Sequence, residues 1–81
     1  MNHEQTERLA GCFRKVFPRL SRAEIETASH ANTAAWDSVV QVTLISLIGE
    51  EFGVELDFEE FEEATSYAAF HSIVGAKLSE A

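Results

Sequence analysis

The residue best placed for chemistry is Ser38, which follows Asp37 at the start of the long apolar run WDSVVQVTLISLIGEEF. A helix that begins there offers unpaired backbone N–H groups and the positive end of its dipole. An anion such as a phosphate ester on the Ser38 hydroxyl would be stabilised in that field. Asp37 and Ser38 are also ordinary helix-capping residues, so the local pattern alone favours a cap over a modification site.

A hydrolytic role for Ser38 lacks the other parts that such a site needs. A nucleophilic serine requires a base and an oxyanion site, and no G-x-S-x-G elbow surrounds Ser38. Of the histidines His3, His30 and His71, only His30 lies in a segment that can approach Ser38. We therefore expect no catalytic residues and no enzymatic activity.

No metal site is expected either. Cys12 is the single cysteine, and no Cys or His pair has zinc spacing. The acidic stretch GEEFGVELDFEEFEE lacks the alternating oxygen ligands and central glycine of an EF-hand loop. A lone thiol cannot form an internal disulfide, so packing must stabilise the fold.

The 81 residues fit one domain, and their net charge of −8 argues against nucleic acid and anionic membranes as partners. Residues 50–63 contain eight acids and no base, whereas residues 1–22 contain five of the six Lys and Arg residues. This layout predicts a solvated acidic face or a basic partner. The apolar run is too short to span a bilayer, and the polar start does not resemble a signal peptide, so we expect a cytoplasmic protein.

Apolar spacing predicts an all-α fold, a small four-helix bundle with a long loop between its first two helices. The expected helices cover residues 2–17, 38–52, 58–64 and 66–79, the third being short, with a further helical turn near residues 22–28 in the loop. The expected helix caps and stops are Pro18, Ser21 with Glu24, Asp37, Gly53, Asp57 with Glu60, and Thr65 or Ser66.

Each main helix has one face that is expected to be buried. On the helix over 38–52 a second, mixed stripe should face solvent or a partner, and it consists of Val39, Thr43, Ser46 and Glu50. The expected core residues are Leu9, Phe13, Val16 and Phe17; Val42, Leu44, Ile45, Ile48 and Phe52; Phe58 or Phe61; and Tyr67, Phe70, Ile73 or Val74, and Leu78.

Beyond these local patterns, the chain resembles the acyl carrier protein family. The resemblance rests on Asp37-Ser38-Val39, on the apolar ladder that follows with Val42 and Leu44, and on the closing EEFGVEL of residues 50–56. It continues through DFEEFEEATSYAAFHSIV, residues 57–74, where the family has an acidic short helix and then a capped last helix. The resemblance is good over residues 36–78, and residues 1–35 agree in pattern and length only.

The resemblance implies a specific function. A phosphopantetheinyl transferase would attach 4'-phosphopantetheine to Ser38, with Asp37 positioning the serine, and acyl-transferring or condensing enzymes would use the thioester that the arm carries. A discrete, monomeric carrier of fatty-acid, polyketide or other specialised biosynthesis is expected. The implied partner-binding residues are Val39, Val40, Thr43, Ser46 and Glu50. The implied acyl-chain pocket consists of Ile45, Ile48, Phe52 and Phe70.

Departures from the family pattern keep alternatives open. Val39 replaces the leucine that usually follows the serine, and Trp36 before Asp37 favours a carrier of a specialised pathway. An aminoacyl, D-alanyl or peptidyl carrier is one alternative, although such carriers commonly have glycines where this chain has Ala34 and Ala35. An unmodified helical adaptor that binds a partner through residues 39–50 is the other.

Overall fold

The computed structural model describes residues 1–80 and confirms the all-α architecture, with no β-strand in that range. The described elements, in chain order, are α1 (His3–Val16), α2 (Arg22–Glu26), α3 (Ser38–Phe52), the short 3₁₀ helix η1 (Phe58–Phe61) and α4 (Tyr67–Glu80). None of the helices described over these residues is long and apolar enough to cross a bilayer.

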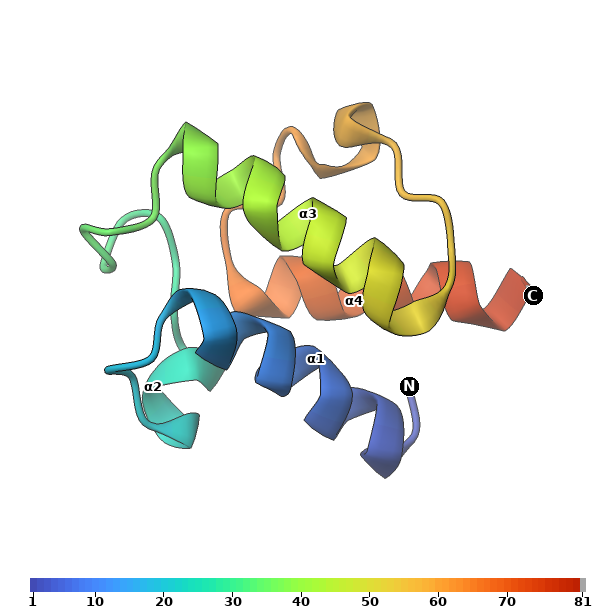
Figure 1. The fold of residues 1–81 in the computed structure, drawn as a ribbon, viewed down its shortest axis with the longest axis horizontal. Helices are drawn as coiled ribbons and strands as arrows, with labels where there is room; N and C mark the ends of the chain where they lie inside the picture. The colour runs from blue at the N-terminus through green and yellow to red at the C-terminus, as the bar shows by residue number, and fades with distance from the viewer. Residues whose placement is uncertain (81) are drawn as a thin grey trace.

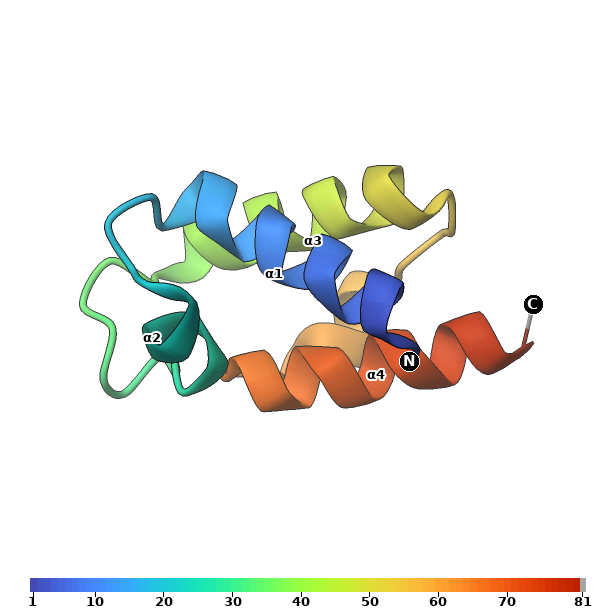
Figure 2. The ribbon, with the colours of Figure 1, turned by 90° about the horizontal axis from the view of Figure 1, so that it is seen from below.

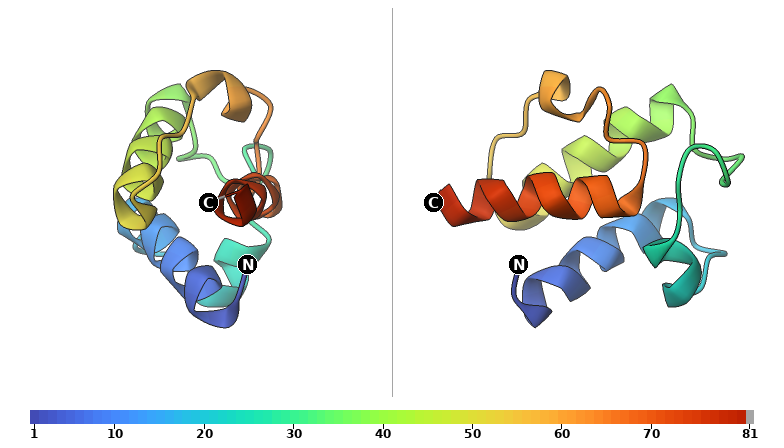
Figure 3. Two further views of the ribbon diagram at one scale, coloured as in Figure 1. Left: turned by 90° about the vertical axis from the view of Figure 1, so that its right-hand side faces the viewer. Right: turned by 180° about the vertical axis from the view of Figure 1, so that it is seen from behind.

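The three long helices pack around one interior. α1 and α3 run antiparallel, and α4 runs in the same direction as α3 (Figure 1). Seen from below, α1 and α3 lie together over α4 (Figure 2), and the view along α4 shows η1 at the edge between α3 and α4 (Figure 3, left). The short α2 contacts both α1 and α4. The long connection between α1 and α3 thus carries the chain around one end of the bundle.

Several helix ends are set by the side chains that the sequence predicts. The Asp37 carboxylate accepts a hydrogen bond from Val40 N at 2.9 Å and caps α3. Ser21 and Glu24 form a reciprocal capping box at α2. Gly53 ends α3 with φ 63°, a left-handed conformation that glycine adopts without a Cβ penalty.

Of the two cap candidates for α4, Thr65 and Ser66, the structure uses Ser66, whose hydroxyl accepts a hydrogen bond from Ala69 N at 3.1 Å. The predicted cap at Asp57 is wrong: its side chain makes no capping bond, and η1 has only four residues where a helix over 58–64 was expected. Without a cap, this acidic turn has little to propagate it beyond one 3₁₀ turn.

Aromatic rings occupy the centre of the core. The ring of Phe13 lies edge-on to three others, with centroid distances of 5.7 Å to Trp36, 5.1 Å to Tyr67 and 5.4 Å to Phe70. Burial of such rings and their edge-to-face contacts stabilises a domain too small for a large aliphatic core. The largest fully buried side chains in the described part of the chain are Leu9, Phe13, Ile25, Leu44, Ile48, Phe61, Phe70 and Val74.

The predicted inward face of α3 is wrong at Val42, which is 49% exposed. Phe52 is only half-buried, because it lies at the rim, where the Arg8 guanidinium covers its ring at 5.0 Å. Apolar residues occur all around this helix, so their spacing does not determine its rotation. The other predicted core residues are at least partly buried, with Phe61 inside in place of Phe58 and Val74 more deeply buried than Ile73.

The loop before α3 is tied to the start of α4. His30 N donates to Thr65 O at 2.8 Å, and Tyr67 N donates to Ala28 O at 3.0 Å. These bonds flank an isolated antiparallel bridge between Ser29 and Ser66. The segment that the sequence predicts as a loop with few packing residues is therefore held against the bundle, and Trp36 at its end is buried in the core.

Candidate functional site

Ser38 is the first residue of α3, and it is exposed to solvent. The neighbouring Asp37 uses its carboxylate to bind Val40 N and its carbonyl to accept from Gln41 N. The N–H groups of Ser38 and Val39 precede the first intrahelical bond and have no partner within the helix. The hydroxyl of Ser38 is thus accessible at the positive end of a fifteen-residue helix.

A shallow hollow of about 230 Å³ lies beside Ser38. It brings together the loop before α3, the first turn of α3, η1 and the segment before α4. Its lining residues are His30, Trp36, Asp37, Ser38, Gln41, Phe58, Glu62 and Thr65. His30 therefore shares a surface with Ser38, as its place in the loop suggested.

The Gln41 side chain fixes one wall of this hollow, and the sequence analysis did not identify it. Its carbonyl oxygen accepts from the Trp36 indole N–H at 2.8 Å. Its amide nitrogen donates to the carbonyl oxygens of Phe61 at 2.8 Å and Ala64 at 3.0 Å. One amide on α3 thus ties the indole before Ser38 to η1. The only signal for this role in the sequence is a single amide within an apolar run, five residues after Trp36.

The stripe of Val39, Thr43, Ser46 and Glu50 is exposed along α3, as the sequence predicts. Val39 is 71% exposed, whereas the neighbouring Val40 is half-buried and packs against the core.

Two further apolar side chains are also open to solvent: Val42, which is predicted in the core, and Phe58, for which the sequence offers Phe61 as the alternative core residue. Val42 is 49% exposed on α3 and Phe58 is 48% exposed on η1. Exposed large apolar side chains that lie near one another are typical of interaction surfaces.

The residues implied for an acyl-chain pocket are core residues in the structure. Ile48 and Phe70 are fully inaccessible to solvent, Ile45 is buried, and Phe52 is half-buried at the rim. Ile45 and Ile48 come from α3 and Phe70 from α4, so the structure does bring them to the same interior.

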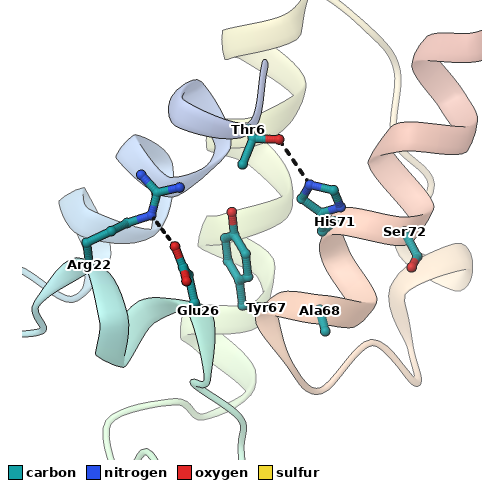
Figure 4. A pocket seen from close by; sticks show the side chains of 7 residues that line it. All are labelled: Thr6, Arg22, Glu26, Tyr67, Ala68, His71 and Ser72. Carbon is teal, nitrogen blue, oxygen red and sulfur yellow. Dashed lines mark hydrogen bonds and ion pairs between the residues drawn. The ribbon is translucent and has the colours of Figure 1, made fainter. Parts of the chain in front are cut away.

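A second hollow, of about 390 Å³, lies away from Ser38 where α1, α2 and α4 meet (Figure 4). Arg22 pairs there with Glu7 at 2.6 Å and with Glu26 at 2.9 Å. This pairing lowers the pKa of Glu7, chiefly through the hydrogen bond from Arg22. The Tyr67 hydroxyl is buried beside them with no hydrogen-bond partner within residues 1–80, and its burial raises the pKa of the phenol. None of the predicted site residues lines this hollow.

Two other expectations concern reactive or metal-binding side chains. Cys12 is buried, and burial raises the pKa of its thiol, which keeps the sulfur in its unreactive protonated form. Within residues 1–80 no three His, Cys, Asp or Glu side chains are grouped so as to hold a metal ion. Ser38 is therefore the side chain on which a covalent function is best argued.

Comparison with known proteins adds no assignment. No protein-family model, curated protein or solved structure matches this chain.

The capping role of Asp37 can be tested by substitution. We expect Asp37→Ala to lower the free energy of unfolding by about 1 kcal/mol, because Val40 N loses its acceptor, and Asp37→Asn to lower it by a few tenths at most. Urea denaturation of both variants measures the difference. If Asp37→Asn destabilises the protein as much as Asp37→Ala, the side-chain cap is not the source of the effect.

Proposed function

We propose that this protein is an acyl carrier protein whose Ser38 carries a 4'-phosphopantetheine arm. The observation that supports the proposal most directly is the placement of an exposed serine hydroxyl at the capped N-terminus of α3, beside an open hollow. The second support is the resemblance of residues 36–78 to the carrier family. In this proposal the protein is a cytoplasmic monomer and catalyses no reaction itself.

The residues around Ser38 fit a phosphodiester. The unpaired N–H groups of Ser38 and Val39 and the helix dipole favour an anion at this end of α3. Asp37 holds the first turn in shape through Val40 N, so that the Ser38 hydroxyl is presented in one position to a phosphopantetheinyl transferase. When bound, the arm supplies a terminal thiol that holds acyl groups as thioesters.

Partner enzymes would dock along α3. Val39 is the apolar contact next to the modified serine, and Thr43, Ser46 and Glu50 extend the surface by three further turns. Glu50 is the only acid among these four, so basic enzymes would be steered mainly by the acidic segment 50–63 rather than by the region next to Ser38. Partner choice near Ser38 would then depend on the shape of Val39.

Intact mass tests the proposal. We expect the protein that is coexpressed with a broad-range phosphopantetheinyl transferase to gain one phosphopantetheinyl group. Ser38→Ala should gain none, whereas Ser72→Ala, which removes an exposed hydroxyl from α4 outside the docking surface, should be modified like the wild type. An unmodified wild-type chain would overturn the proposal.

The alternative of an unmodified helical adaptor is favoured by one observation. Val39, Val42 and Phe58 expose large apolar side chains close to the start of α3. The mass experiment separates the two functions, because an adaptor would remain unmodified and Ser38→Ala would not change its behaviour. An aminoacyl, D-alanyl or peptidyl carrier would be modified at Ser38, and incubation with acyl and aminoacyl ligases would distinguish it.

A further inference from the structure

Aromatic rings fill the interior between α3, η1 and α4. Phe61 and Phe70 are both 0% exposed, and their ring centroids lie 4.9 Å apart. Phe61 comes from η1 and Phe70 from α4. An acyl chain that entered between these two elements would have to lie where the two rings now pack. Interiors packed in this way contain few voids, so an acyl chain could enter only if a core side chain were displaced.

The Phe70 ring is confined on its other sides as well. The ring of Phe13 lies 5.4 Å away and the indole of Trp36 5.9 Å away, centroid to centroid. A rotation of Phe70 would disturb both of these contacts. The ring therefore has no neighbouring space into which it can move without a change in the core.

Gln41 restrains η1, the element that carries Phe61. Its amide donates to the backbone carbonyls of Phe61 and Ala64, and its oxygen is bound by the Trp36 indole N–H. Moving η1 outward to open a channel beside Ser38 would break these hydrogen bonds and leave polar groups unpaired. The entrance nearest to Ser38 is thus held shut by hydrogen bonds as well as by packing.

The surface beside Ser38 offers a different environment. The hollow of about 230 Å³ is open to solvent, and it combines the polar side chains of His30, Gln41, Glu62 and Thr65 with the rings of Trp36 and Phe58, so that more of its exposed lining is apolar than polar. Such a lining suits amide and hydroxyl groups next to a short apolar segment. Because the hollow is open, it cannot enclose a long alkyl chain, whose burial requires a surrounding apolar wall.

From this packing we infer that the protein carries short or polar acyl groups that stay on its surface, and that Phe61 and Phe70 exclude long alkyl chains from the interior. The inference rests on the proposed carrier function and departs from the acyl-chain pocket that the family resemblance implies: in this inference Ile45, Ile48, Phe52 and Phe70 serve as core residues and do not line a channel.

The test compares acyl chains of different length on the wild-type protein. The transferase loads Ser38 with the acetyl-, hexanoyl- or dodecanoyl-phosphopantetheine arm of the corresponding coenzyme A thioester: the Ser38 oxygen gives up its proton and bonds to the phosphorus, the pyrophosphate bond breaks, and adenosine 3',5'-bisphosphate leaves. Cleavage by hydroxylamine and the melting temperature are then measured. We expect the same melting temperature for all three and cleavage rates within about twofold, because a surface thioester needs no local opening. A dodecanoyl form that is raised in melting temperature and cleaved about tenfold more slowly overturns the inference.

A pair of variants tests whether the Phe61 ring excludes the long acyl chain from the interior. Phe61→Ala removes a buried ring, so the dodecanoyl form of this variant should melt higher and be cleaved more slowly than its acetyl form. Glu59→Ala removes an exposed side chain from the same 3₁₀ helix, outside the hollow beside Ser38, and should behave as the wild type does. Equal cleavage of both forms of Phe61→Ala would show that Phe61 does not exclude the chain. If Phe61→Ala fails to fold, Phe61→Leu takes its place, and the wild-type comparison still decides.

The failure of this inference and that of the carrier function give different results. A wild-type chain that the transferase leaves unmodified overturns the carrier function, and the inference with it. If the protein is loaded but protects the dodecanoyl thioester from hydroxylamine, the carrier function remains and only the inference is overturned.

Discussion

Replacing Phe70 by alanine is expected to lower the free energy of unfolding by about 3–5 kcal/mol. The side chain is fully buried and its ring contacts those of Phe13, Trp36 and Phe61. Alanine would leave a cavity that this aromatic cluster cannot fill without moving several rings. Since a domain of this size has a total stability of roughly 4–12 kcal/mol, the variant would lose a large share of it. Urea denaturation followed by circular dichroism measures the loss.

Two further variants control the measurement. Phe70→Leu keeps most of the apolar volume and should cost less than Phe70→Ala. Phe58→Ala changes a ring that is 48% exposed and should cost a small fraction of the Phe70→Ala effect. A loss of less than about 1 kcal/mol for Phe70→Ala would contradict the packing described between α4 and η1.

Replacing Gln41 by leucine is expected to cost about 2–4 kcal/mol, although leucine is similar in size. The change removes three hydrogen bonds at once. The Trp36 indole N–H and the Ala64 carbonyl lose their partner, whereas the Phe61 carbonyl keeps its bond from Ala64 N. Each polar group that is left unpaired away from water adds to the loss. The same urea experiment measures it, with Thr43→Ala on the exposed side of α3 as a nearly neutral control.

Gln41→Glu tests the same network through pH. The introduced carboxylate can still accept from Trp36, but it would face the carbonyls of Phe61 and Ala64, which raises its pKa in the folded state. A carboxyl whose folded pKa is raised destabilises the fold as pH rises from its unfolded pKa through its folded pKa. The variant should therefore be closest to the wild type in acid and fall behind towards neutral pH. A pH-independent difference between the two proteins would contradict the hydrogen-bonding pattern.

The ends of the helices were largely predictable because short-range chemistry sets them. Asp37 caps α3, Gly53 ends it, and Ser21 with Glu24 opens α2, each through atoms within a few residues. The all-α class followed from the same patterns. The cap predicted at Asp57 is wrong, because the Asp57 side chain accepts no hydrogen bond from the N–H groups of η1. A capping sequence shows only that such a hydrogen bond is possible.

Features that depend on distant parts of the chain could not be predicted in this way. Val42 was assigned to the core because α3 is apolar on several sides, and only packing against α1 and η1 determines which side is buried. Trp36 lies in a loop, and its burial depends on α1 and α4. For the site, Ser38 and the exposed stripe were found from sequence. The role of Gln41 was not, because its partners are about twenty residues away.

The burial of Trp36 also provides an optical probe. It is the only tryptophan of the chain, its indole N–H is bound by Gln41, and it lies two residues before Ser38. Its fluorescence therefore originates from a single position where the aromatic core meets the start of α3. Unfolding would expose this indole to water, and any event at Ser38 that disturbs the first turn would be reported by the same emission. The chain can thus be followed in solution without an added label.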